Sequence, residues 1–263
     1  MLGRKHQKTA QEHPEYLKKD KKGKLQKAGG NWSGFYALDL DNEDAVKYIK
    51  KCLKHYVDLG FDFFKLDFLY ASAVFEYAGR SRAQVQQKAY ELLRECLGDK
   101  LILGCGAQLA NSFNNFDYLR IGPDVSLIFD DLAYMRLFHR ERISTKVTLQ
   151  NTIYRSFMNN RLFGNDPDVF LLRDDNIQLS KKQRKALITI NALFGSVLMT
   201  SDNVAEYDDE KKELLKQSLE LFKHAKVKEY KTVRHSIKVT YELNGVEHSF
   251  TYNTQKGELS NER

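Results

Sequence analysis

Apolar and polar residues follow a strand-like and then a helix-like spacing, in turn, along most of this chain. Short apolar runs separate longer segments whose apolar residues recur every three or four positions, as on one face of a helix. Strand and helix in this order predict an α/β fold with a parallel sheet. The predicted strands are FYALDL (35–40), FDFFKLDFL (61–69), LILGC (101–105), FDYLRI (116–121), DVFLL (168–172) and SVLMT (196–200), and the predicted helices are 43–59, 81–97, 145–160, 180–195 and 208–223.

Polar residues in front of three of the predicted helices are suited to cap them. Asp41 or Asn42 precedes the first helix, and Ser81 and Ser180 precede two of the others. Their side chains accept hydrogen bonds from the free N–H groups of a first turn. Gly60 follows the first helix and is expected to end it.

After residue 225 the spacing of apolar residues changes to two. VKEYKTV, SIKVTYEL and VEHSFTY alternate in the manner of short strands, and Asn244-Gly245 is a hairpin signal. We therefore expect three parts: a basic, mostly irregular segment over 1–34, a main α/β domain over 35–225, and a small antiparallel segment over 226–263.

The positive charge of the chain is concentrated in its first residues. The formal net charge is +7 over 263 residues, and residues 1–30 contain nine Lys or Arg against three acids, a net +6. Such a segment is either an electrostatic tail for nucleic acid or a solvated lysine-rich loop. Lys outnumbers Arg and no aromatic stacking platform accompanies it, so we expect no nucleic-acid partner.

Cysteine usage and hydropathy indicate a soluble, cytoplasmic protein without a membrane partner. Cys52, Cys96 and Cys105 are odd in number and lack CxxC spacing, which disfavours a disulfide framework or a zinc cluster. The longest apolar runs are far shorter than the 18 or more residues of a membrane span. The first residues contain no apolar stretch typical of a secretory signal.

Charged residues stand at the ends of several predicted strands, where parallel α/β folds place their sites. Lys65 and Asp67 have a spacing of two, so both point to one side of a strand. They form either a buried ion pair or a functional pair in which the lysine keeps the carboxylate ionised and hydrogen-bonds substrate. Another strand ends in Ser201-Asp202, and Asn165-Asp166-Pro167-Asp168 precedes the run at 168–172.

Asp124 follows an Ile-Gly-Pro turn after the strand at 116–121. It is either the N-cap of a helix or a carboxylate of the site, and Arg120 is placed to bind Asp124 or a substrate hydroxyl. Two carboxylates at the tips of different strands suit retaining glycoside hydrolysis, in which one attacks the sugar and the other protonates the leaving oxygen, at about 5–5.5 Å from each other.

Five motifs in order resemble the melibiase group of glycoside hydrolase family 36. These are GFDFFKLDFLYA, LILGCGAQL, DYLRIGPDV, NDPDVFLLR and GSVLMTSD, and HPEYLKKDKKGK and NWSGFYALDLDNEDAVKYI extend the match upstream, over roughly residues 10 to 255. Members of the family are α-galactosidases with a (β/α)8 barrel and a C-terminal β domain.

The resemblance implies a role for six residues. Asp67 matches the nucleophile and Asp124 the general acid/base. Lys65 and Arg120 match substrate-contacting positions, Cys105 lies where related enzymes place a pocket cysteine, and Asp166 lies in a segment at the rim of the site or supporting it. The implied substrate is an α-galactoside oligosaccharide, and no cofactor or metal is expected.

The chain departs from the family at its start, because the nucleophile strand is normally the fourth of eight. Only strands four to eight are recognisable, and Trp32 does not match the residues that grip galactose. We expect an incomplete (β/α)8 TIM barrel followed by the antiparallel segment. Two interpretations stay open. The chain is an active α-galactosidase, either alone, as a homo-oligomer or completed by an upstream polypeptide. Alternatively, it is a catalytically inactive remnant that binds sugar or serves as an interaction module.

Overall fold

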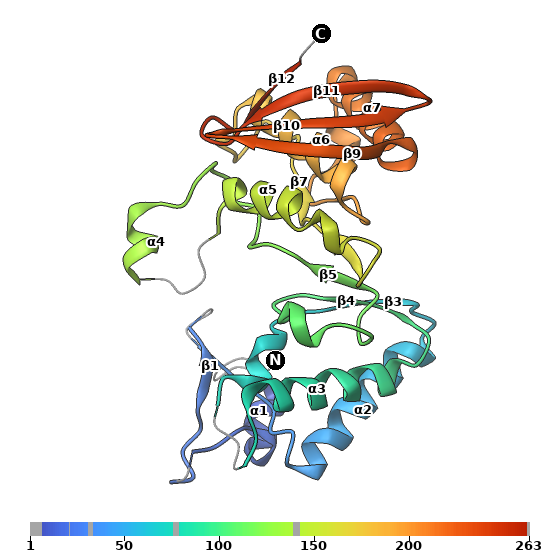
Figure 1. Ribbon diagram of the computed structural model, residues 1–263. Helices are drawn as coiled ribbons and strands as arrows, with labels where there is room; N and C mark the ends of the chain where they lie inside the picture. The colour runs from blue at the N-terminus through green and yellow to red at the C-terminus, as the bar shows by residue number, and fades with distance from the viewer. Residues whose placement is uncertain (1–6, 21, 31–33, 76–78, 139–142, 262–263) are drawn as a thin grey trace. The chain divides into compact units, whose positions relative to one another are not determined.

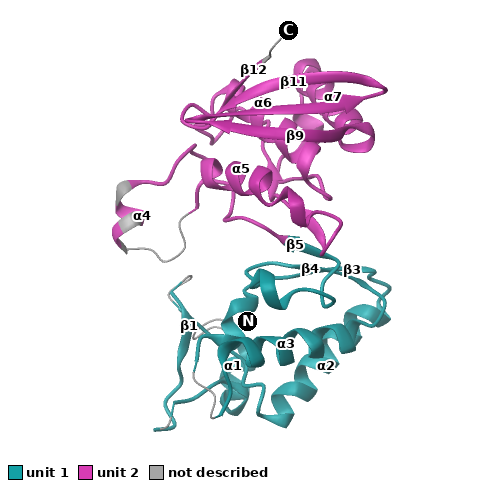
Figure 2. Ribbon diagram, viewed as in Figure 1, with its two compact units in different colours: residues 1–119 teal, residues 120–263 magenta. Residues whose placement is uncertain are grey.

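The computed structural model describes residues 7–20, 22–30, 34–75, 79–138 and 143–261. Trp32 and part of the basic segment (1–6 and 21) lie outside these residues. The chain divides into two compact units, residues 1–119 and 120–263 (Figure 2). The division falls inside one strand, not at the boundaries expected from the sequence, and the three-part organisation stays a prediction.

The first unit builds a parallel sheet and covers it with two helices (Figure 1). β3 pairs in parallel with β4, and β4 pairs in parallel with β5 through Tyr118 and Leu119. This confirms the predicted α/β fold with a parallel sheet. The elements are α1 (Lys8–Glu12), β1 (Lys27–Gly29), β2 (Phe35–Tyr36), α2 (Glu43–Asp58), β3 (Phe63–Leu66), α3 (Arg82–Leu97), β4 (Leu101–Gly104) and β5 (Tyr118–Arg120), with short 3-10 turns at Pro14–Tyr16, Leu69–Ala73 and Leu109–Asn111.

The predicted caps in the first unit are confirmed. Asn42, rather than Asp41, accepts hydrogen bonds from the N–H groups of Asp44 and Ala45 at the start of α2. Ser81 and Gln84 form a reciprocal capping box on α3. At the opposite end of α3, the Arg94 guanidinium bonds the carbonyl of Asn115 and the carboxylate of Asp117. These contacts fix α3 against the amino ends of the strands.

The second unit packs helices against an antiparallel sheet. β10 pairs with β9 and β11, and β11 pairs with β12, all antiparallel. The elements are α4 (Ala133–Phe138), α5 (Thr145–Tyr154), β6 (Gly164–Asp166), β7 (Val169–Phe170), α6 (Lys181–Phe194), β8 (Met199–Thr200), α7 (Asp209–His224), β9 (Lys226–Val233), β10 (Ser236–Leu243), β11 (Val246–Asn253) and β12 (Glu258–Asn261), with 3-10 turns at Ser156–Met158 and Val204–Glu206.

The core of the second unit lies between α6 and the antiparallel sheet (Figure 1). Leu187 and Ile190 of α6 pack in one cluster with Ile237 and Val239 of β10. The predicted hairpin at Asn244-Gly245 is confirmed, since both residues have positive φ (51° and 80°) as a type I′ turn requires. β6, β12 and α4 were not predicted.

Among the described residues, no helix is both long and apolar enough to cross a bilayer.

Candidate active site

Lys65, Asp67 and Cys105 lie in the first unit at the carboxyl ends of two neighbouring strands. Lys65 belongs to β3, Asp67 follows β3, and Cys105 follows β4. The ladder continues past the strands, because the Cys105 N–H donates to the Leu66 carbonyl at 2.8 Å and the Cys105 carbonyl accepts from Leu69 N–H at 3.2 Å. Cys105 therefore lies beside the turn that carries Asp67, and Cys105 is buried.

The turn at Asp67 is shaped by the residue that follows it. Asp67 Oδ1 accepts a hydrogen bond from Phe68 N–H at 2.6 Å. Phe68 has a φ of 56°, which is uncommon for a bulky residue. Its ring packs on Phe35 and Tyr70, with centroids 5.2 and 6.0 Å away. Apolar packing of Phe68 thus holds the turn that presents the Asp67 carboxylate.

Gly106 allows the chain to pass close to this turn. Its φ is 63°, and a Cβ there would lie 3.2 Å from Tyr70 Cδ1 and 3.4 Å from Phe68 Cα. Its carbonyl accepts a hydrogen bond from Tyr70 N–H at 2.8 Å. The left-handed conformation and the close approach both favour glycine after Cys105.

The interpretation of Lys65 and Asp67 as a buried ion pair is wrong. Both residues are exposed, and no ion pair joins them within the described part of the chain. Their side chains share one side of β3 by the spacing of two. The functional interpretation of the pair stays a prediction.

Arg120, Asp124 and Asp166 come together in the second unit, with Asp168 as a fourth member. The guanidinium of Arg120 uses all three nitrogens: Nη1 lies 2.9 Å from Asp124 Oδ1, Nε 2.9 Å from Asp166 Oδ2, and Nη2 2.6 Å from Asp168 Oδ1. We call these four residues the Arg120 network. It joins the end of β5, the loop after it, the end of β6 and the residue before β7.

Most of the Arg120 network is buried, but Asp124 is not. The side chains of Arg120, Asp166 and Asp168 are 4%, 0% and 9% exposed, whereas that of Asp124 is 67% exposed. A buried charge is tolerated only when it is paired and hydrogen-bonded, and Arg120 meets this condition with two buried carboxylates. Burial raises the pKa of Asp168 despite the neighbouring Arg120. The network thus ends in one carboxylate that reaches solvent.

The helix N-cap interpretation of Asp124 is wrong. Residues 125–132 form no helix, and α4 begins only at Ala133. The Asp124 carbonyl accepts a hydrogen bond from Ser144 N–H at 3.3 Å. The carboxylate is therefore held by Arg120 and not by a helix terminus.

Asp168 is a functional candidate that the sequence reasoning did not select. Its Oδ2 accepts a hydrogen bond from Val125 N–H at 2.6 Å. Its φ of 72° is left-handed, which costs a non-glycine residue about 1–2 kcal/mol. Two features of the sequence point to Asp168. Arg120 lies in an apolar run and therefore needs charged partners, and Asp168 is a second carboxylate two residues after Asp166.

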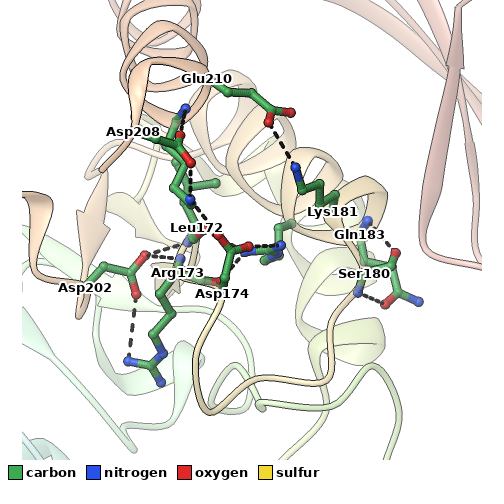
Figure 3. A network of polar contacts seen from close by, with 11 residues as sticks. Leu172, Arg173, Asp174, Ser180, Lys181, Gln183, Asp202, Asp208 and Glu210 are labelled. Carbon is green, nitrogen blue, oxygen red and sulfur yellow. Dashed lines mark hydrogen bonds and ion pairs between the residues drawn. The ribbon is translucent and has the colours of Figure 1, made fainter. Parts of the chain in front are cut away.

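A second polar network fixes the carboxyl ends of β7 and β8, which pair in parallel (Figure 3). Asp202, noted at a strand end in the sequence, accepts hydrogen bonds from Leu172 N–H at 2.5 Å and Arg173 N–H at 3.0 Å. Its Oδ2 also accepts from the Tyr207 hydroxyl at 2.7 Å. Asp202 therefore clamps the loop after β7 to the end of β8.

Asp174 continues this network toward α6 and α7 (Figure 3). Its carboxylate lies 2.6 Å from Lys211 Nζ and 2.7 Å from Arg184 Nη2. Hydrogen bonds from Lys211 and Arg184 lower the pKa of Asp174 to about 2. Like Asp124, Asp174 is an exposed carboxylate on a buried arginine, which makes it a natural control for the Arg120 network.

No protein-family model matches the chain. Among solved structures, an α-galactosidase from Thermus thermophilus in complex with p-nitrophenyl α-D-galactopyranoside is similar, with 27% identity, a TM-score of 0.74, and coverage of 92% of this chain and 48% of that one. The same enzyme in complex with stachyose gives 28% identity, a TM-score of 0.66, and coverage of 81% and 46%.

A more distant match shows the same fold. α-Galactosidase I from Mortierella vinacea has 14% identity, a TM-score of 0.63, and coverage of 86% of this chain and 59% of that one. The chain spans about half the length of the solved α-galactosidases that it matches. These solved structures are thus α-galactosidases, and this chain is similar to about half of each.

Proposed function

We propose that this chain carries the two catalytic carboxylates of a retaining α-galactosidase similar to glycoside hydrolase family 36. The barrel would be incomplete, with β3 standing for the fourth of eight strands. The observation that carries the proposal is the placement of Asp67 and of the Arg120–Asp124 pair after parallel strands, β3 and β5. Parallel α/β folds build their active sites at these strand ends. The Thermus thermophilus match supports the substrate class.

The mechanism assigns one step to each carboxylate. Asp67 attacks the anomeric carbon, so that a bond forms between that carbon and a carboxylate oxygen while the bond to the leaving oxygen breaks. Asp124 gives its proton to the leaving oxygen. Asp124 then takes a proton from water, the water oxygen attacks the anomeric carbon, and the Asp67 carboxylate is released.

The remaining candidates support these two residues in different ways. Lys65 is exposed on the strand that leads to Asp67 and is assigned to substrate hydroxyls. Cys105 is buried beside the Asp67 turn and is assigned to the wall of the substrate pocket. Arg120 has its three nitrogens on carboxylates, so we assign it to holding Asp124, and Asp166 to holding Arg120.

Terminal α-galactosides are the proposed substrates. Two of the similar structures hold p-nitrophenyl α-D-galactopyranoside and stachyose. A second copy of the chain or an upstream polypeptide that completes the barrel is proposed as partner. The proposed location is the cytoplasm.

Hydrolysis of p-nitrophenyl α-galactoside by the purified chain tests the proposal. Asp67→Ala should abolish turnover, and azide should partly restore it by taking the place of the carboxylate. Asp124→Ala should lower kcat by about 10²–10⁴-fold, the usual range for a general acid. Asp62→Ala is the matched control, because Asp62 is an exposed carboxylate just before β3 and should be replaceable without loss.

The alternative is a non-catalytic remnant that binds sugar or a partner. Turnover by the unmodified chain that Asp67→Ala removes excludes it. No turnover in any of these proteins contradicts the catalytic proposal and favours the remnant. Equilibrium dialysis with radiolabelled galactose then shows whether sugar binding is retained.

A further inference from the structure

Asp168 contacts both the backbone next to Asp124 and the arginine that binds the Asp124 side chain. Its Oδ2 accepts the N–H of Val125, the residue after Asp124, at 2.6 Å. Its Oδ1 lies 2.6 Å from Nη2 of Arg120, whose Nη1 contacts Asp124. One buried carboxylate thus fixes the backbone that follows Asp124 and the guanidinium that holds its side chain.

The backbone of Asp168 is itself fixed on both sides. Its N–H donates to Asp166 Oδ1 at 2.8 Å, and its carbonyl accepts from Asn191 Nδ2 at 3.2 Å. Its left-handed φ of 72° persists because these contacts determine it. Backbone strain of this kind is concentrated at active sites, ligand clamps and switch regions.

Asp166 and Asp168 differ in what they hold. Both contact Arg120, but only Asp168 also accepts the N–H of the residue beside Asp124. A counter-charge for Arg120 would not need this second contact. The bond to Val125 therefore indicates that Asp168 sets the position of the loop and not only the charge balance.

We propose that Asp168 is the positioning residue of Asp124, acting through Arg120 and through the backbone at Val125. The proposal rests on the proposed function in giving Asp124 the role of general acid. It is not a catalytic role for Asp168, because both of its oxygens are engaged within the protein. A misplacement of about 1 Å in a reacting group is enough to lower a rate about 10²-fold.

Amide hydrogen exchange tests the contact without any need for activity. In the unmodified chain, Val125 should exchange at least about tenfold more slowly than the exposed Leu127, because its N–H is bonded. Asp168→Ala should remove this protection, because no side-chain oxygen remains to accept the Val125 N–H. Asp174→Asn, which removes an exposed carboxylate from another buried arginine, should leave it unchanged.

Leaving-group dependence tests the consequence for catalysis. Acid assistance matters for phenyl α-galactoside and little for the dinitrophenyl compound, whose leaving group departs without a proton. Asp168→Asn should therefore lower kcat/KM about 10–100-fold on the phenyl compound and less than about threefold on the dinitrophenyl compound. A merely structural role would lower both equally.

The proposal is overturned if the Val125 amide is unprotected in the unmodified chain, a result that needs no variant to fold. It is also overturned if Val125 exchange is unchanged in Asp168→Ala, or if Asp168→Asn lowers kcat/KM equally on both substrates. If the unmodified chain hydrolyses neither substrate, the proposed function fails for this chain, and the exchange result alone decides whether Asp168 positions Asp124.

Discussion

Asp67 and Asp124 are held by opposite kinds of interaction. Asp67 stands on a turn fixed by the aromatic packing of Phe68, and its carboxylate accepts one hydrogen bond from the next residue. Asp124 is held by a buried guanidinium that two buried carboxylates clamp. One position thus depends on apolar packing and backbone conformation, and the other on charge. Substitutions and pH should therefore affect them differently.

Removal of Arg120 should have the largest effect on this difference. Arg120→Met leaves Asp166 and Asp168 buried without their partner, which typically costs about 3–5 kcal/mol of stability. Asp67→Asn removes an exposed carboxylate and should change the free energy of unfolding by less than about 0.5 kcal/mol. Urea unfolding followed by circular dichroism measures both. Equal values would show that the Arg120 network does not stabilise the second unit.

Loss of Asp166 should have a smaller effect than loss of Arg120. Asp166→Asn leaves one oxygen for two donors, Arg120 Nε–H and Asp168 N–H, and loss of a hydrogen bond to a charged group costs about 1.5–3 kcal/mol. Asp174→Asn is the matched control at an exposed carboxylate and should cost about 0–1 kcal/mol. The same unfolding measurement compares them, and a larger loss in Asp174→Asn would reverse our ranking of the two networks.

A substitution at Gly106 tests how far close packing stabilises the turn at Asp67. Gly106→Ala introduces both left-handed strain and contact with Tyr70 and Phe68, so it should cost about 2–3 kcal/mol. Gly60→Ala also has positive φ, 89°, but its Cβ would meet open space, and it should cost only about 1–2 kcal/mol. Thermal unfolding of the two variants separates crowding from strain. Equal losses would mean that the Asp67 turn tolerates the extra methyl group.

The pH dependence of stability should have opposite signs in the two polar networks. Burial raises the pKa of Asp168, so its stabilising contribution is full below pH 3.8 and falls as the pH rises through its folded-state pKa. Lys211 and Arg184 lower the pKa of Asp174 to about 2, so its contribution is present above pH 3.8 and is lost as the pH falls toward 2.

Unfolding free energies measured from pH 2 to pH 7 check the two pH dependences expected for Asp168 and Asp174. The difference between the unmodified chain and Asp168→Asn should shrink as pH rises, and the difference from Asp174→Asn should grow. The effect is expected to be the smallest of the set, because Asp174 is exposed to solvent screening. Slopes of the same sign would contradict the assignment.

Local signals in the sequence predicted the helices well. Asn42, Ser81 and Ser180 each accept a backbone hydrogen bond at a predicted helix start. Such caps act within four residues and need no knowledge of the rest of the fold. The Asn244-Gly245 hairpin is local in the same way.

Polar segments that are buried by distant partners could not be predicted in this way. β6 (Gly164–Asp166) is polar in sequence yet buried, because Asp166 meets Arg120, 46 residues earlier. Asp168 was also missed, because its partner Arg120 is similarly distant in the sequence. Conversely, the run at 61–69 reads as a buried strand, but Phe61 and Phe63 are about half exposed. Its burial depends on what packs on that side of β3.

Covalent trapping tests whether Asp67 is the nucleophile. The purified chain is incubated with an activated fluorinated α-galactosyl fluoride, whose fluorine slows breakdown of a glycosyl–enzyme ester, and is then analysed by intact and peptide mass spectrometry. We expect one sugar per chain, attached to Asp67 and absent in Asp67→Asn. A label on another carboxylate, or turnover of the p-nitrophenyl substrate with no label, would contradict it.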